Sequence, residues 1–182
     1  MNTDTLVMTM GPPNPPQKRW VEARFERFHY WPRADGFRMI PETADDMIAL
    51  WLAETALPYV LLMHVDVVPV AATERIVEFR GIVGFCSAVD HKGCLLHGGR
   101  VNMKCLKLRR AEMLQLDRPR IAWGKTVCEC IMFDRLCRKR GWTPECVGQI
   151  GHRFPVTHLP SGGILYDRQL MNGEHKAQRR PT

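Results

Sequence analysis

The stretch Cys130-Ile-Met-Phe-Asp-Arg-Leu-Cys-Arg-Lys-Arg-Gly-Trp142 indicates the fold class more clearly than any other part of the chain. Its apolar residues fall on one face of a helix, while Asp134, Arg135 and Arg138 fall on the other. Gly141 ends the helical pattern, because glycine readily adopts the left-handed conformation that closes many helices. Immediately upstream, residues 120–127 have the composition of a strand. A strand, a helix, a glycine and an aromatic residue in this order are typical of the closing half of an α/β fold.

The composition is that of one globular domain. The chain has 182 residues, of which 45% are hydrophobic and 25% charged, so it can bury a sizeable core. Its longest apolar run, residues 59–70, contains His64, Asp66 and Pro69 and is too short to cross a bilayer as a helix. The first residues lack the basic start and apolar stretch of a secretory signal. We therefore expect a cytoplasmic protein with no membrane partner.

Cysteine and charge usage narrow the class further. The seven cysteines, an odd number, lie mostly inside apolar segments, which favours reduced thiols over a disulfide framework. The net charge of +7 is concentrated in residues 104–120 and 135–140. Such clusters attract phosphate, either in nucleic acid or in a nucleotide-bearing cofactor. A solvated helix face is the commoner explanation of any one cluster.

The two ends of the chain differ from its middle. Residues 1–19 are expected to form a flexible arm, because Pro12, Pro13, Pro15 and Pro16 fix an extended backbone and remove amide donors. The polar, basic segment 161–182 has no apolar periodicity and is expected to form a flexible tail. A single domain is therefore predicted over residues 20–160.

Strands and helices alternate within this domain. A short strand at 37–40 precedes a helix that begins at Pro41, with Thr43 as its N-cap and Asp46 completing a capping box, and that stops before Pro58. The other expected elements are strands at 59–70, 75–80, 81–89 and 94–97, a helix at 104–116, a strand at 120–127 and a helix at 130–140. Together they predict an α/β fold with a mixed, mostly antiparallel central sheet flanked by helices.

This order of elements resembles the GNAT N-acetyltransferase superfamily. Phe37-Arg-Met-Ile-Pro-Glu-Thr-Ala-Asp-Asp46 resembles that family's opening strand and acidic helix start. Gly81-Ile-Val-Gly-Phe85 resembles its central strand, and residues 133–142 resemble its closing helix. The resemblance covers roughly residues 37 to 146. Within the superfamily, the chain is most similar to the divergent GNAT-like proteins of short-tailed phages, some of which are internal virion components.

The resemblance implies acyl transfer from acetyl-CoA to an amine. In family members the cofactor pyrophosphate binds to backbone amides at a helix start, where glycines allow close approach. The family's glycine-spaced loop is missing here, although Gly98 and Gly99 precede the equivalent stretch. A displaced loop would bring Arg100, Lys104 and Arg109 to the phosphates. The missing loop favours weak or lost catalysis.

The same resemblance implies an acid and a base. Many members place a tyrosine four residues before the closing glycine to protonate the leaving thiolate, and here that residue is Cys137. A small core residue is the commoner role for such a cysteine. Asp90, His91 and Glu129 are the candidate bases. The first two also fit a solvated turn, and Glu129 also fits the dipole of a helix start.

A zinc site is a weaker interpretation of the cysteines and histidines. His91, Cys94 and His97 are separated by two residues each, and a second set could comprise Cys128, Cys130, Cys137, Cys146 and His152. Structural zinc sites usually contain two pairs of closely spaced ligands, and two such pairs do not occur here. The sequence therefore predicts no metal site.

Nucleic acid is a further possible partner class. Residues 18–33 interleave basic and aromatic residues, which can hold phosphates and stack bases. The same aromatic side chains could instead pack on the core. Three functions remain open: an acetyl-CoA-dependent N-acyltransferase with weak or lost activity, a non-catalytic protein that binds a virion or host partner, and a small basic accessory protein that binds nucleic acid. If the protein is phage-encoded, as the resemblance implies, it would act in the host cytoplasm or the virion interior.

Overall fold

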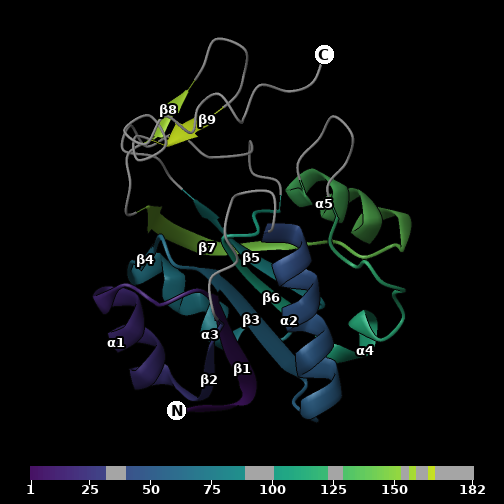
Figure 1. Cartoon of the computed structure of the whole chain (residues 1–182), viewed down its shortest axis with the longest axis horizontal. Coiled ribbons are helices and arrows are strands. Elements are labelled where there is room, and N and C mark those ends of the chain that lie inside the picture. Colours follow the sequence, from purple (N-terminus) through teal and green to yellow (C-terminus); the bar gives the residue numbers. More distant parts are fainter. Residues whose placement is uncertain (32–39, 89–100, 123–128, 153–155, 159–163, 167–182) are drawn as a thin grey trace.

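The computed structural model describes residues 1–31, 40–88, 101–122, 129–152, 156–158 and 164–166 (Figure 1). Their main feature is a seven-stranded sheet with the strand order β2-β1-β3-β6-β5-β7-β4. Its strands are β1 (Asn2–Met10), β2 (Phe25–Trp31), β3 (Tyr59–His64), β4 (Val67–Pro69), β5 (Val83–Ala88), β6 (Cys105–Arg109) and β7 (Glu145–His152). A separate antiparallel pair joins β8 (Val156–His158) to β9 (Ile164–Tyr166). The helices are α1 (Pro15–Arg24), α2 (Ile40–Glu54), α3 (Arg75–Glu78), α4 (Arg110–Met113) and α5 (Glu129–Lys139), and a 3-10 turn, η2, spans Ala71–Glu74.

The predicted α/β class and the mixed sheet flanked by helices are confirmed. Parallel ladders join β1 to β2, β1 to β3 and β5 to β7. Antiparallel ladders join β3 to β6, β5 to β6 and β4 to β7. Antiparallel pairing therefore accounts for half of the ladders in the large sheet, rather than for most of them.

The first 31 residues form the start of the sheet, and the expectation of a flexible arm over residues 1–19 is wrong. β1 lies between β2 and β3, and its Val7 and Met8 are fully buried. The prolines do not prevent this, because they lie outside the strand: Pro15 occupies the first turn of α1, where the missing N–H is not needed. The segments Asn2–Met10 and Pro15–Trp31 are therefore folded as strands and a helix.

Side-chain alternation along the strands divides the core into two layers. On one face, Met8, Val60 and Leu106 pack against α2, α4 and α5. On the other face, Val7 and Leu61 pack against α1 and α3. Figure 1 shows α2 crossing the first face of the sheet and α1 lying beside the sheet on the other side. The period of two along each strand, with both sides apolar, is that of a sheet covered on both faces.

Two predicted elements have the wrong type. Residues 104–116, expected as a helix, form β6 and the short α4. The helical pattern was misleading because Lys107 is fully buried, so that the strand period of two is hidden behind a charged residue. The segment 75–80, expected as a strand, contains α3 (Arg75–Glu78) instead, whose Ile76 and Val77 are both buried against the sheet. Tertiary packing overrides the β-propensity of this segment.

Other expected elements are correct in part. The helix predicted from Pro41 is α2, but it begins at Ile40, so Thr43 lies inside the helix and is not its N-cap. Phe37 and the two residues after it lie outside the described residues, as do 94–97 and most of 120–127. The predicted strand at 59–70 is two strands, β3 and β4, separated by a turn at Val65 and Asp66. Within the tail expected over 161–182, the described part is β9.

The helix and glycine that suggested the fold class are confirmed. α5 ends at Lys139, and Gly141 has a φ of +74°. The amide of Gly141 donates to the Arg138 carbonyl at 3.0 Å, and the amide of Trp142 donates to the Cys137 carbonyl at 2.9 Å. These two bonds form a Schellman motif, which satisfies carbonyls at the end of the helix. Trp142, 9% exposed, then packs into the core beside α5.

Among the described residues the longest helix, α2, has 15 residues, and none of the helices could span a bilayer.

Candidate functional site

The strand order changes direction at β1, and this marks the candidate site. From β1 the chain passes through α1 to β2 on one side, and then through α2 to β3 on the other side. Met10 and His64 are register partners at the carboxyl ends of β1 and β3. In open α/β sheets with this connectivity, ligands bind outside the carboxyl ends of the strands at such a switch point.

Two buried amides hold the loops at this edge together. The Asn14 Nδ2 atom donates to the carbonyls of Val65 (2.7 Å) and Val67 (2.8 Å), and its Oδ1 accepts from the Gln17 amide at 3.0 Å. Gln17 Nε2 donates to the His64 carbonyl at 2.7 Å. The start of α1 therefore fixes the turn that follows β3, and this turn carries Asp66.

A partly buried ion pair links that turn to the residue before β6. Lys104 Nζ contacts Asp66 Oδ2 at 2.6 Å, and the two side chains are only 8% and 14% exposed. Lys104 reaches this edge because β6 is antiparallel to β3, so that β6 begins where β3 ends. The His64 amide donates to the Lys104 carbonyl at 2.9 Å, and the Lys104 amide donates to Asn102 Oδ1 at 2.9 Å. We call Asn14, Gln17, Asp66, Asn102 and Lys104 the switch-point cluster.

The cluster has unused hydrogen-bonding capacity. Gln17 Oε1 and Asn102 Nδ2 are buried and have no hydrogen-bond partner in the part of the chain that the structure describes. Most buried polar groups are paired, and an unpaired one costs about 1–3 kcal/mol. Folds tend to keep such violations at functional sites.

The first residues of α5 lie beside this cluster. The Met103 amide donates to Cys130 Sγ at 3.4 Å, which ties the segment before β6 to the start of α5. Glu129, the first residue of α5, is 6% exposed. Two predicted site residues, Lys104 and Glu129, are therefore on neighbouring segments.

The start of α1 is not itself a phosphate site. Pro15 and Pro16 have no N–H, the Gln17 amide is bonded to Asn14 Oδ1, and the Lys18 amide is bonded to the Asn14 carbonyl. The amides that usually bind phosphate at a helix start are therefore absent or occupied. Charge at this edge is supplied by the side chains of Asp66 and Lys104 instead. A carboxylate accepts hydrogen bonds from ribose hydroxyls, and an ammonium group binds phosphate.

The structure separates Arg109 from the other predicted site residues. Arg109 is at the far end of β6 from Lys104, about 17 Å away at a rise of about 3.4 Å per residue. Its Nε donates to Glu112 Oε2 at 2.7 Å. The segment is a strand and not the expected helix, so Lys104 and Arg109 lie at opposite ends of it.

Cys137, the predicted acid, lies on α5 and is fully buried in the core. Burial and the neighbouring Asp134 carboxylate raise the pKa of its thiol to about 12. This environment fits the core role that the sequence left open. The predicted residues Asp90, His91, Gly98, Gly99 and Arg100 lie outside the described residues.

The other sequence hypotheses meet mixed outcomes. Trp20 and Phe25, from the basic and aromatic segment, are buried in the core, as the packing interpretation predicts, whereas Phe28 is exposed. Within the described residues, His, Cys, Asp and Glu side chains form no group of three or more that could hold a metal ion. The residues of the switch-point cluster other than Lys104 carry no sequence motif. Only the turn that interrupts the apolar run at Asp66 could have pointed to them.

A scan against models of protein families gives no match, and a search of curated proteins gives none either. Among solved structures, the chain is similar to A197 from STIV, with a TM-score of 0.60 and 12% sequence identity. The match covers 91% of this chain and 94% of that protein. At this identity the similarity concerns the fold alone, and it extends over nearly the whole of both chains.

Proposed function

We propose that the protein binds a nucleotide-linked donor at the switch-point cluster and transfers a group from it to an acceptor. The observation that carries the proposal is the partly buried Asp66–Lys104 pair, in a turn whose backbone Asn14 and Gln17 bond at the carboxyl ends of β1 and β3. This position in a β-α-β-α-β arrangement is where α/β proteins usually bind nucleotides.

The two charged side chains suit the two ends of such a ligand. Asp66 would accept hydrogen bonds from the ribose, and Lys104 would bind the phosphates. The start of α1 offers no free amide, so recognition would depend on these side chains rather than on a glycine loop. This arrangement is consistent with the absence of a glycine-spaced phosphate motif from the sequence.

Acetyl-CoA, the donor implied by the resemblance to N-acetyltransferases, belongs to this class because CoA contains an adenosine diphosphate. In that case Glu129, at the start of α5, would act as the base that takes a proton from the acceptor amine. The nucleotide site and the donor class are separate parts of the proposal. A panel of nucleotide-linked compounds can distinguish them.

The test is a thermal-shift assay with acetyl-CoA, ADP, UDP and GDP. A ligand at 100 times its Kd stabilises the folded state by about 2.7 kcal/mol, which raises the melting temperature by several degrees. The double variant Asp66→Asn/Lys104→Met removes both charges of this pair together, so that neither member is left facing the site of its missing partner. We expect at least one nucleotide to stabilise the native protein and to lose its effect in this variant.

The matched control is Lys18→Met/Glu22→Gln, which removes an exposed pair at 3.8 Å on α1. This control should respond to nucleotides as the native protein does. A shift with UDP or GDP but not with acetyl-CoA would reject the acyl donor and keep the site. Equal shifts in the native protein and the Asp66/Lys104 variant, or no shift with any compound, would overturn the proposal.

A further inference from the structure

The two edges of the large sheet differ in how well they are protected. β4, at one edge, has three residues and ends in Pro69, which has no N–H to offer another strand. β2, at the other edge, has seven residues and no proline. Short edge strands and prolines are common protections against pairing with another chain, and β2 has neither.

The exposed side chains of β2 are suited to a contact. Residues Glu26 to His29 are exposed in succession, and Phe28 is 39% exposed. The Phe28 ring stacks on the Tyr30 ring at 5.3 Å between centroids. Large aromatic side chains at an edge contribute much of the energy of a protein interface.

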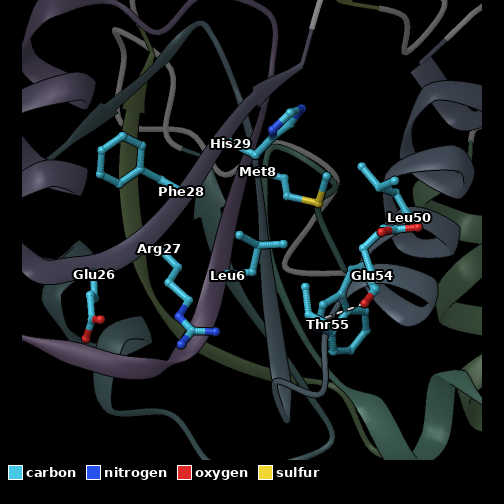
Figure 2. Close-up of a pocket in the computed structure, with 10 residues that line it drawn as sticks. Leu6, Met8, Glu26, Arg27, Phe28, His29, Leu50, Glu54 and Thr55 are labelled. Atoms are coloured by element: carbon cyan, nitrogen blue, oxygen red, sulfur yellow. Dashed lines mark hydrogen bonds between the residues drawn. The ribbon is translucent and has the colours of Figure 1, made fainter.

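A groove runs along β2 on the face that α2 covers only in part. It has a volume of about 390 Å³, and Leu6 and Met8 form its floor. Figure 2 shows Arg27 and His29 of β2 on one side of the groove and Leu50, Glu54 and Thr55 on the other, while Phe28 points away. A strand added beside β2 would therefore find an apolar groove on one face and an aromatic pair on the other.

The charge of this edge favours a second copy of the chain as the partner. The protein carries +7 overall, which would repel another copy at most positions. β2 itself contains one acidic residue, Glu26, and one basic residue, Arg27, and the groove adds Glu54. Two copies can therefore meet at β2 without net repulsion, whereas an acidic partner such as nucleic acid gains little there.

We propose that β2 is the interface of a homodimer, in which the β2 strands of two copies pair antiparallel about His29. In this alignment Phe28 lies opposite Tyr30 of the second copy on one face, and the reverse pair forms across the two-fold axis. On the other face Arg27 lies opposite Trp31 of the second copy, at the mouth of the groove. Both are favourable cross-strand pairs, one aromatic and one cation–π.

Sedimentation velocity of the full chain over a range of concentrations tests this proposal. We expect a dimer whose dissociation constant rises at least tenfold in Phe28→Lys, because a lysine on an edge strand opposes pairing. Leu114→Lys is the matched control, since Leu114 is 60% exposed and lies after α4, away from β2. This control should keep the native dissociation constant. Melting temperatures of both variants show whether they are folded.

Amide hydrogen exchange gives a second, independent measurement. Amides of β2 should exchange more slowly as the protein concentration rises, and those of β4 should not change. A native protein that is monomeric at every concentration would overturn the proposal. So would a dimer that Phe28→Lys leaves intact and that does not protect β2.

Discussion

Gly141 is the residue at which backbone conformation can be separated from packing. Its φ is +74°, and a Cβ atom added there would meet nothing within 4 Å. Gly141→Ala should therefore cost only the backbone strain of the left-handed region, about 1 kcal/mol, and lower the melting temperature by about 3 °C. Gly141→Asn should cost less, since asparagine tolerates this region. Chemical denaturation measures the free energy of unfolding of both variants. A loss above about 3 kcal/mol in the alanine variant would mean that the Schellman motif and Trp142 had moved.

The type of each site residue and its neighbours in the sequence determine whether the sequence alone can identify it. Lys104 and Glu129 are charged residues beside apolar segments, and the sequence identifies both as candidates. Asn14 and Gln17 are polar residues in a proline-rich stretch, where a flexible arm is the simplest expectation. Their importance depends on burial, 4% and 0% exposed, which only the folded chain creates.

At the scale of elements, Asn14 joins the start of α1 to the turn between β3 and β4. Asn14→Ala removes the helix cap and leaves the Val65 and Val67 carbonyls without their side-chain donor, so we expect a loss of about 2–4 kcal/mol. Asn14→Asp keeps the acceptor for the Gln17 amide but places a carboxylate against two carbonyls. It should be as destabilising at neutral pH and recover in part at acidic pH, where a protonated carboxyl can donate.

Urea denaturation at neutral and acidic pH measures the effect of both Asn14 variants. Gln115→Ala is the control, because it removes one exposed hydrogen bond, to the Ala111 carbonyl, and should change stability by less than about 0.5 kcal/mol. If Asn14→Ala behaves like this control, the bridge between α1 and the turn contributes nothing to stability.

The elements predicted correctly are those whose pattern is local. α2 and α5 have apolar residues at helical spacing, and β3 and β5 are continuous apolar runs, so each is recognisable from its own residues. The sequence does not predict β6, because Lys107 occupies a core position, or β1, because four prolines follow it closely. Strand order is harder to predict from the sequence than the strands themselves. The parallel pairing of β1 with β2 and β3 depends on contacts between residues far apart in the chain.

At the scale of the whole molecule, Lys107 makes stability depend on pH. It is fully buried, and its Nζ donates to the carbonyls of Ile76 (3.2 Å) and Val77 (2.9 Å), which holds α3 against β6. Burial lowers its pKa from 10.5 to about 8, and nearby Arg80 contributes, against the opposite influence of Asp4 and Glu78. The folded protein therefore releases this proton at a lower pH than the unfolded chain does.

The lower pKa of Lys107 in the folded protein determines how stability changes with pH. Below pH 8 both states hold the proton, and the folded state carries the full cost of the buried charge. Between about pH 8 and 10.5 the unfolded state holds more protons, so the free energy of unfolding rises with pH, by up to about 3 kcal/mol. Lys107→Met abolishes this rise, because methionine does not titrate. The free energy of unfolding of the native protein minus that of the variant should therefore rise between neutral and alkaline pH.

Denaturant titrations at a series of pH values measure this difference. Lys139→Met, which removes an exposed lysine at the end of α5, should follow the native pH profile. The two carbonyls that lose their donor in Lys107→Met are affected equally at every pH, so they shift the whole curve and not its slope. A constant difference between the native protein and Lys107→Met would mean that the buried amine keeps an ordinary pKa. In that case β6 and α3 would separate enough for water to reach the amine. The core layer between the sheet and α3 would then be packed less tightly than in the structure.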